Sequence, residues 1–385
     1  MSREKLLEIE KEMNIRFIDR REEIHGLTLG AISREHVLIL GPPGTTKSGL
    51  ESAYANYMGS TSNFPWLMTQ FSTPDEVFGP VDIQAMKSGV YKRITSNKLP
   101  EAETAFIDEV FKANSAILNA MLSILQERIY HNNGTPTQVP LHFAVAASNE
   151  LPEDDDNLQA LYDRFLLRFS TGYLQNEDHV SSLLALDNDA PPTVEPIGMD
   201  VLRACSEEAL ALPLSDEAKS GILLLWSRLR DGGYMFSDRR LKLMTKVMAA
   251  ESWLNGYTEI TPESLIVAEH IMWDRPNQIR DIKSIVRDCV DSGVSKAREI
   301  FEAAREALLE VGYKGTGPTR ADTWNLDIHP RREQVYQMLL SLKSISEQLD
   351  ELPHKPEIIN IRQYVLDAKV ALTDRLTDAD VLAGS

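Results

Sequence analysis

The strongest constraint on this chain is an apolar run that ends in a glycine-rich loop. Residues 37–40 (VLIL) are typical of a fully buried parallel strand. The loop Gly41-Pro42-Pro43-Gly44-Thr45-Thr46-Lys47-Ser48 follows directly. In such a loop, glycines let backbone N–H groups converge on phosphate oxygens, a lysine reaches the β and γ phosphates, and a hydroxyl binds magnesium. We therefore expect this loop to bind phosphate, with Lys47 and Ser48 in the last two roles.

The loop departs from the strict pattern G-x-x-x-x-G-K-[ST] at Thr46, where a second glycine is expected. The chain turns there into the helix whose N-terminus faces the anion. A residue with a Cβ must therefore adopt a conformation compatible with close phosphate approach. The alternative is a glycine-poor turn that binds no nucleotide.

A second short apolar strand ends in two adjacent carboxylates. Residues 104–107 (TAFI) lead directly into Asp108 and Glu109. Neighbouring side chains at the end of a strand point in different directions, so the pair can divide two tasks. We assign Asp108 to magnesium, directly or through its water, and Glu109 to the attacking water as general base. The alternative is an acidic pair that simply ends a strand in an acidic protein.

A third buried strand is predicted at residues 141–147, and it delivers Ser148 and Asn149 to the same edge of the sheet. Ligands of open parallel sheets bind beyond the carboxyl ends of the strands. Asn149 should therefore lie near the γ-phosphate and the attacking water. A turn residue before Leu151 and Pro152 is the alternative interpretation.

Two arginines follow in the segment 160–168, among apolar residues that would anchor it. A guanidinium stabilises charge on a transferring phosphoryl group, and hydrolysis depends on assembly when a neighbouring subunit supplies it. We expect Arg164 to have this role, with Arg168 as the second choice. For either arginine, the alternative is an internal ion pair with Asp163 or with the acidic run 153–156. Together, the four motifs in this order identify an ATPase core.

The residues above resemble a known family. The core is similar to the AAA+ ATPases of the MoxR family and, within it, to the RavA-like branch. The similarity covers roughly residues 10–180 and continues more weakly to about residue 285. The phosphate loop marks only the superfamily, whereas residues 71–80 (FSTPDEVFGP) and 147–152 (ASNELP) are more discriminating.

The resemblance carries functional roles over to the matching residues. These roles fall on Lys47 and Ser48 (Walker A), Asp108 and Glu109 (Walker B), Asn149 (sensor 1) and Arg164 (the arginine finger). Arg239 matches the lid arginine, sensor 2, with Arg240 as a near alternative. The implied ligands are ATP or ADP and Mg²⁺. The departure at Thr46 concerns the rate of turnover more than binding.

The resemblance also implies two insertions, which in the family usually face the ring pore or a partner. Residues 79–98 resemble an insert in the second core helix, and Gly89 is expected in a hairpin turn. Residues 128–140 resemble a hairpin before sensor 1, with its turn at residues 131–134 (HNNG). Without the family, both segments are simply hairpins with Ser-Gly and Asn-Gly turns.

The chain is predicted to fold in the α/β class, with an αβα core around a parallel sheet followed by helical regions. We place the core at residues 1–185, an all-α lid at 198–290 and a helical bundle at 291–385, with a Pro-rich joint at 188–197. Ser215 and Thr261 are typical helix-start residues within the lid.

Three apolar stripes at heptad spacing predict an antiparallel helical bundle at the C-terminal end. The stripes are Val294, Ala297, Phe301, Ala304, Leu308 and Val311; Val335, Met338, Leu342, Ile345 and Leu349; and Ile358, Ile361, Val365, Ala368 and Leu372. RavA-like relatives carry a separate small domain between such helices, but residues 312–330 are too few for one. No partner of that domain is therefore transferred.

Composition favours a cytoplasmic protein that acts on proteins. The net charge of −18 argues against a general grip on DNA or RNA, because phosphate contacts need clustered Lys and Arg. The longest apolar stretch, residues 222–226, is too short to span a bilayer, and the first residues lack an apolar signal region. Cys205 and Cys289 have no metal-ligand spacing and are expected to be reduced core thiols.

The predicted function is ATP hydrolysis by a ring, expected to be a hexamer, that remodels or activates a protein client. MoxR-type ATPases typically act with a protein that bears a von Willebrand factor A (VWA) domain, so the resemblance implies such a partner. The client itself is not visible in the sequence. The alternatives are a nucleic-acid-dependent motor built on the same core and a nucleotide-gated scaffold with little turnover.

Overall fold

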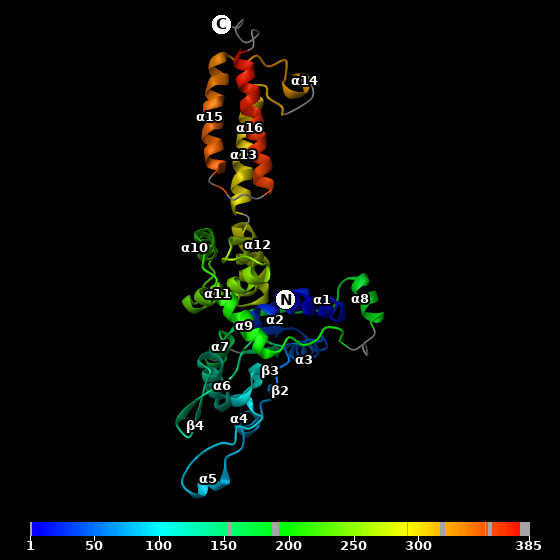
Figure 1. Ribbon diagram of the computed structural model, residues 1–385, viewed down its shortest axis with the longest axis vertical. Coiled ribbons are helices and arrows are strands. Elements are labelled where there is room, and N and C mark those ends of the chain that lie inside the picture. The colour runs from blue at the N-terminus through cyan, green and yellow to red at the C-terminus, as the bar shows by residue number, and fades with distance from the viewer. Residues whose placement is uncertain are drawn as a thin grey trace. The chain divides into compact units, whose positions relative to one another are not determined.

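The computed structural model describes residues 2–152, 156–186, 192–290, 292–315, 320–350, 352 and 356–377, and within them the side chains of 292–299, 320–321, 356–357 and 377 are left out. The chain divides into two compact units, Met1–Val286 and Arg287–Ser385, which are considered separately below. Figure 1 labels their helices and strands.

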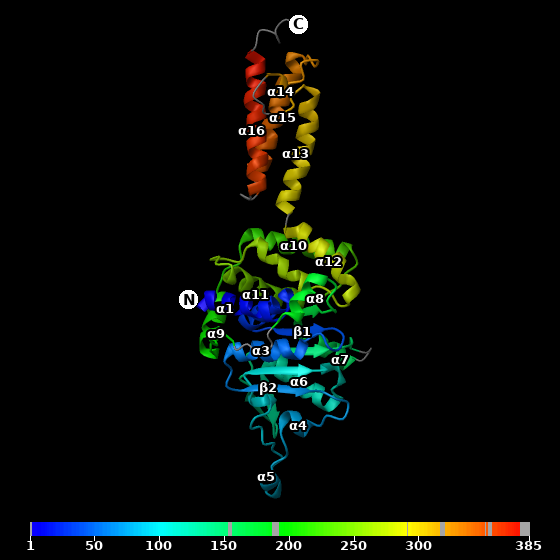
Figure 2. The same ribbon diagram turned by 90° about the vertical axis from the view of Figure 1, so that its right-hand side faces the viewer.

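The first unit is built around a parallel sheet. Its strands are β1 (His36–Leu40), β2 (Asn63–Leu67), β3 (Thr104–Asp108), β6 (Phe143–Ser148) and β7 (Phe165–Ser170). They lie in the order β2-β3-β6-β1-β7, and every neighbouring pair is parallel. Figure 2 shows this sheet, with β1 and β2 labelled. All residues of β1 and β6 are buried, which confirms the buried strands predicted there, although β6 begins two residues later than predicted.

Helices cover this sheet and complete the predicted α/β core. They are α1 (Ser2–Arg16), α2 (Arg21–Ser33), α3 (Lys47–Met58), α4 (Pro74–Phe78), α6 (Ser115–Glu127) and α7 (Asp156–Tyr162), with short 3₁₀ turns η1 (Leu99–Glu101) and η2 (Val110–Lys112). The helices α2 and α3 pack directly against the strands. Because the strands are parallel, the residues that follow β1, β3 and β6 meet at one edge of the sheet.

The segment 128–140 forms the predicted hairpin. Strands β4 (Ile129–Asn132) and β5 (Thr135–Gln138) pair antiparallel. Asn133 and Gly134 have φ values of 55° and 72°, the left-handed conformations that a two-residue hairpin turn of this kind requires.

The segment 79–98 differs from the expected hairpin. It holds a short helix, α5 (Ile83–Lys87), and a single antiparallel bridge joins Val81 to Arg93. The Asp82 carboxylate accepts hydrogen bonds from the backbone of Gln84 and Ala85, which favours a helix start over a strand. Gly89, at φ 79°, therefore follows a helix end, and the prediction of a hairpin turn there was wrong.

One side chain ties the two insertions together. Asn132, at the end of β4, accepts a hydrogen bond from the backbone N–H of Arg93 at 2.9 Å and donates to the carbonyl of Arg93 at 3.0 Å. The Arg93 side chain in turn donates to the carbonyl of Gly79 at 2.6 Å. The amide side chain thus pairs with Arg93 as a neighbouring strand would.

Helices follow the sheet in the rest of the first unit. They are α8 (Glu177–Leu184), α9 (Met199–Leu210), α10 (Asp216–Asp231), α11 (Asp238–Leu254), the 3₁₀ helices η3 (Pro262–His270) and η4 (Pro276–Gln278), and α12 (Ile279–Val290), which ends beyond the unit. Ser215 caps α10 as predicted, and Thr261 precedes a 3₁₀ helix rather than an α-helix. Cys205 and Cys289 are buried and form no disulfide, which agrees with the expected core thiols. Part of the Pro-rich joint, residues 188–191, lies outside the described residues.

His25 joins three helices of the first unit. Its Nδ1 lies 3.1 Å from a carboxylate oxygen of Glu10 on α1, and its Nε2 lies 2.8 Å from a carboxylate oxygen of Glu251 on α11. Burial disfavours the imidazolium, but the hydrogen bonds and charges of the two glutamates outweigh it and raise the pKa of His25 to about 10. The side chain is therefore charged at neutral pH and bridges two anions.

This bridge makes stability depend on pH. Because the folded-state pKa of His25 is raised from 6.5 to about 10, its contribution should be complete below about pH 6.5 and be lost as the pH rises through 10. We expect the Tm of the parent to exceed that of His25→Gln by the most near pH 6, with the two values converging toward pH 10.5. Thermal unfolding of both proteins across this range tests the expectation, and a Tm difference that does not change with pH would contradict it.

The second unit is a helical bundle. It consists of α13 (Ser292–Glu310), the short α14 (Arg320–Thr323), α15 (Arg332–Asp350) and α16 (Pro356–Thr377), and the three long helices pack against one another (Figure 1). The predicted stripes from Leu308 onward form the core or pack against it, as does Phe301. Ala304 is also buried, while the side chains of Val294 and Ala297 lie outside the described residues. Tyr313 and Trp324, which no stripe predicted, add aromatic packing to the core.

The described helices include none that is both long enough and apolar enough to cross a lipid bilayer.

Candidate functional site

The phosphate loop connects β1 to α3, and α3 begins at Lys47. The Lys47 ammonium donates hydrogen bonds to the carbonyls of Gly41 at 2.6 Å and Pro42 at 3.0 Å. A Cβ at Gly41 would lie 2.4 Å from the carbonyl oxygen of Thr171, so this close approach requires glycine. The residues 41–48 thus wrap around the lysine, as a phosphate-binding loop does.

Thr46 adopts a left-handed conformation, with φ 61° and ψ 17°. This conformation is an outlier for a β-branched residue and costs about 1–2 kcal/mol. It is the conformation that the glycine of the strict pattern would take without strain. The loop therefore keeps the glycine-type shape despite the substitution, at a cost in stability.

Replacing Thr46 by Gly should stabilise the protein. The relieved strain of about 1–2 kcal/mol exceeds the entropy cost of a glycine, about 0.4–1 kcal/mol, so a net gain of about 1 kcal/mol is expected. We expect nucleotide affinity to change less than about tenfold, or ~1.4 kcal/mol. Thr46→Ala is the matched control, since it also loses the Thr46 hydroxyl contact but keeps a Cβ. Denaturant unfolding and equilibrium nucleotide binding measure both effects. If Thr46→Ala had the same free energy of unfolding as Thr46→Gly, the inference that a Cβ is strained at this position would be wrong.

The polar residues after the three central strands lie within contact of the loop. Ser48 Oγ donates to an Asp108 carboxylate oxygen at 3.0 Å, and Lys47 Nζ donates to Asn149 Oδ1 at 3.0 Å. The Asn149 amide nitrogen donates to Glu109 Oε1. The hydroxyl and carboxylate oxygens of Ser48 and Asp108 are the ligand type that Mg²⁺ prefers, so these residues fit the ion. All five side chains predicted for this edge are therefore adjacent.

Burial shapes the charges behind the loop. It lowers the pKa of Lys47, against the opposing charges of Asp108, Glu109 and Glu51. Glu51 lies on α3 one turn after the lysine and is almost fully buried. Burial, and then the charge of Asp108, raise the pKa of Glu51 well above its usual value. Sequence reasoning missed Glu51, which no motif marks.

A cavity of about 280 Å³ adjoins the outer side of the loop. The Tyr173 hydroxyl donates to the carbonyl of Pro43 at 3.2 Å beside it. The lining combines loop residues with apolar side chains from three other segments, among them Phe17, Ile18, Tyr173, Leu174, Val180 and Leu183. Such a lining suits a flat aromatic base next to the phosphates. No motif in the sequence pointed to these lining residues.

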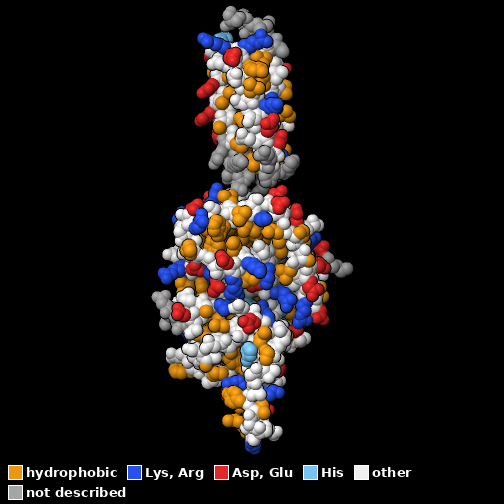
Figure 3. Space-filling model, turned by 90° about the vertical axis from the view of Figure 1, so that its left-hand side faces the viewer, with side chains coloured by type: hydrophobic (Ala, Val, Ile, Leu, Met, Phe, Trp, Pro, Cys, Tyr) orange, Lys and Arg blue, Asp and Glu red, His pale blue; other side chains and the backbone are white. Residues whose placement is uncertain are grey.

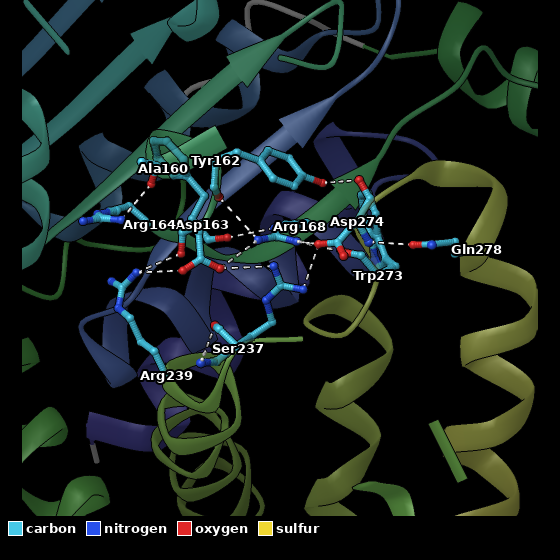
Figure 4. A network of polar contacts seen from close by, with 12 residues as sticks. Ala160, Tyr162, Asp163, Arg164, Arg168, Ser237, Arg239, Trp273, Asp274 and Gln278 are labelled. Atoms are coloured by element: carbon cyan, nitrogen blue, oxygen red, sulfur yellow. Dashed lines mark hydrogen bonds and ion pairs between the residues drawn. The ribbon is translucent and has the colours of Figure 1, made fainter. Parts of the chain in front are cut away.

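The predicted arginines form a separate cluster (Figure 4). Arg239, from the start of α11, donates to the backbone carbonyl of Asp163 at 3.0 Å and to its carboxylate at 3.3 Å. Arg240 pairs with the carboxylates of Asp163 at 3.1 Å and Asp274 at 2.9 Å. The described part of the chain shows no hydrogen bond or ion pair between this cluster and residues 41–48. The structure therefore does not bring Arg164 or Arg239 to the chain's own phosphate loop.

Exposure separates the candidates within this cluster. Arg168 is 0% exposed and is held by the carbonyl of Trp273 at 2.7 Å and by Asp274 at 3.1 Å, so it cannot reach another molecule. Arg164 is half-buried and donates to the carbonyl of Ala160 at 2.9 Å, with no carboxylate partner among the described residues. The side chain of Arg239 is 29% exposed, whereas Arg240 is buried. Arg164 and Arg239 are thus the accessible members.

The geometry defines a class of protein. A parallel sheet in the order β2-β3-β6-β1-β7, a phosphate loop after β1, an acidic pair after β3, a polar residue after β6 and a helical lid are together the AAA+ ATPase fold. Residues 4–191 match the family model described as the MoxR domain in the MoxR-vWA-beta-propeller ternary systems, and residues 221–286 match an AAA lid domain. The chain belongs to the MoxR family of AAA+ ATPases.

Individual proteins are similar to this chain. The protein is 37% identical over 323 residues to the uncharacterized protein MJ0079 of Methanocaldococcus jannaschii, covering 83% of this chain and 84% of that one. It is 29% identical over 161 residues to the chaperone MoxR1 of Mycobacterium tuberculosis, covering 40% and 41% of the two chains. A solved structure from Cytophaga hutchinsonii shares the fold, with a TM-score of 0.59 at 18% identity over 74% of this chain and 94% of that one. The narrower RavA-like assignment stays a prediction.

Proposed function

We propose that this chain binds ATP with Mg²⁺ and hydrolyses it. The observation that carries this proposal is the continuous set of contacts from Lys47 through Asn149 to Glu109, beside the Ser48–Asp108 contact. These contacts bring together, at one edge of the sheet, the residues that this proposal assigns to the phosphates, the magnesium, the polar sensor and the general base. A structural role for the acidic pair alone does not require this arrangement.

In this proposal each residue has one task. The backbone of residues 41–48 and the Lys47 ammonium hold the phosphates, and Ser48 and Asp108 hold the magnesium. The ion would neutralise charge on the phosphates during transfer. Glu109 accepts the proton of the attacking water, and Asn149 positions that water against the γ-phosphate. The cavity beside Tyr173 would take the base of the nucleotide.

We further propose that the site is completed by a second copy in a ring, expected to be a hexamer. Arg164 and Arg239 lie together around Asp163, in a cluster separate from their own phosphate loop. Burial, and then the charge of Arg239, lower the pKa of Arg164, while the charges of Asp163 and Glu127 oppose this shift. The γ-phosphate of a neighbouring subunit would add an anion beside the two guanidinium groups.

The partner proposed for this ring is a VWA-domain protein, together with an unknown protein client in the cytoplasm. The family model's description places MoxR domains in systems with a vWA component, and MoxR1 is named a chaperone. The insert at residues 79–98 exposes Ile83, Met86 and Tyr91, and Figure 3 shows hydrophobic side chains gathered over it. Exposed apolar side chains of this kind support contact with a protein.

The direct test is an ATPase assay. We expect phosphate release that requires Mg²⁺ and is lost in Lys47→Ala, which should also lose nucleotide binding. A folded parent that binds nucleotide without turnover would support the scaffold alternative instead. A parent whose hydrolysis requires added DNA would support the nucleic-acid motor.

A further inference from the structure

Each carboxylate oxygen of Glu109 has a polar neighbour. The Asn149 amide nitrogen donates a hydrogen bond to Oε1. Oε2 is buried and accepts no hydrogen bond among the described residues, but the Lys112 ammonium forms an ion pair with it at 3.3 Å, and the Lys112 side chain is 43% exposed. A general base needs one oxygen that is free and held at a fixed position. One of these contacts must therefore open for catalysis, and the other can serve as an anchor.

The backbone builds the contact with Lys112. Glu109 has a left-handed conformation, with φ 53° and ψ 42°, and starts the 3₁₀ turn η2 that ends at Lys112. The Lys112 backbone N–H donates to the Glu109 carbonyl at 2.9 Å. The turn brings Lys112 back to Glu109, and the ammonium and the carboxylate form an ion pair at 3.3 Å. The left-handed conformation of Glu109 thus sets the direction of its side chain at the start of the turn.

The contact with Asn149 is the one that nucleotide would change. Asn149 Oδ1 accepts from Lys47, the residue that would bind the γ-phosphate. A phosphate that takes Lys47 removes that partner and leaves the Asn149 side chain free to turn, which releases Oε1 of Glu109. Lys112 has no contact with the phosphate loop among the described residues, so it keeps Oε2 throughout.

We propose that Lys112 is a positioning residue that anchors Oε2 of Glu109, so that Oε1 faces the attacking water. This proposal rests on the proposed function. Glu109 and Lys112 both line a cavity of about 830 Å³ beyond the carboxyl ends of β2 and β3, which gives water access to the base. A half-exposed ion pair adds little to folding stability, so a purely structural reason for the contact is weak.

The test compares Lys112→Met, Lys112→Arg and the control Lys219→Met, an exposed lysine on α10. We expect Lys112→Met to lower kcat on the order of tenfold to a hundredfold, because a misplaced catalytic group costs about that much. KM and the Kd for nucleotide should stay near parental values, since the phosphate loop is untouched. Lys112→Arg should keep most of kcat, and Lys219→Met should keep all of it.

Each other outcome overturns the anchor. A Lys112→Met protein with parental or higher kcat shows that Glu109 needs no anchor. Equal losses in Lys112→Met and Lys112→Arg, or a matching loss of nucleotide binding, indicate a structural role without positioning. If the parent hydrolyses ATP and Glu109→Gln does not, these results reject Lys112 and leave the proposed function intact. A parent without hydrolysis would overturn both.

Discussion

Glu109→Gln is expected to lose most ATP hydrolysis and to retain nucleotide and magnesium. Removing a general base costs about 10²–10⁴-fold in rate, whereas the phosphate loop, Ser48 and Asp108 are unchanged. Turnover at saturating ATP and magnesium, measured beside equilibrium binding of the nucleotide, separates the two effects.

The matched control is Glu150→Gln, because Glu150 is exposed and lines the same cavity as Glu109. It should hydrolyse ATP at the parental rate. A Glu109→Gln protein that also does so would show that another group activates the water, and the assignment of the base would be wrong.

Arg164→Ala should have the larger effect, about 10³–10⁵-fold in kcat, if its guanidinium stabilises the transferring phosphoryl group of a neighbouring subunit. Nucleotide binding should persist, since Arg164 makes no described contact with its own loop. Mixing Arg164→Ala with Glu109→Gln should restore part of the activity. At some interfaces, an intact Glu109 from one subunit then meets an intact Arg164 from the other.

In the control mixture, a chain that carries both substitutions replaces Glu109→Gln. When this chain is mixed with Arg164→Ala, no subunit has an intact Arg164, so no rescue is expected. In addition, the specific activity of the parent should rise with protein concentration in the presence of ATP. Hydrolysis that does not depend on concentration, by a species that sediments as a monomer and shows no rescue, would reject the shared site and leave Arg164 as an ordinary structural residue.

The sheet edge was predictable because its signals are local. The apolar runs at β1, β3 and β6 each end in polar residues, and parallel pairing alone brings those ends together. Lys47, Asp108 and Asn149 therefore lie as close in the structure as the sequence indicated. The heptad stripes of the second unit were predictable for the same reason, since helical periodicity repeats over many residues.

Features that depend on distant or single residues were not predictable. Arg168 is held by Asp274, which lies 106 residues further along the chain, and nothing near Arg168 signals that partner. Lys112 is a single lysine three residues after the acidic pair, and no periodic pattern in the sequence marks it. Gly89 suits a hairpin turn and a helix end equally, and the nearby cap at Asp82 decided between them.

Asn132 couples the two insertions mechanically. Its amide pairs with both backbone groups of Arg93, so a pull on the 79–98 insert strains the β4–β5 hairpin at the same time. One residue, Arg128, separates α6 from the hairpin, and two residues separate η2 from α6. A load applied to the insert therefore passes through Asn132 and the hairpin to α6 and η2, the segment that directly follows Glu109.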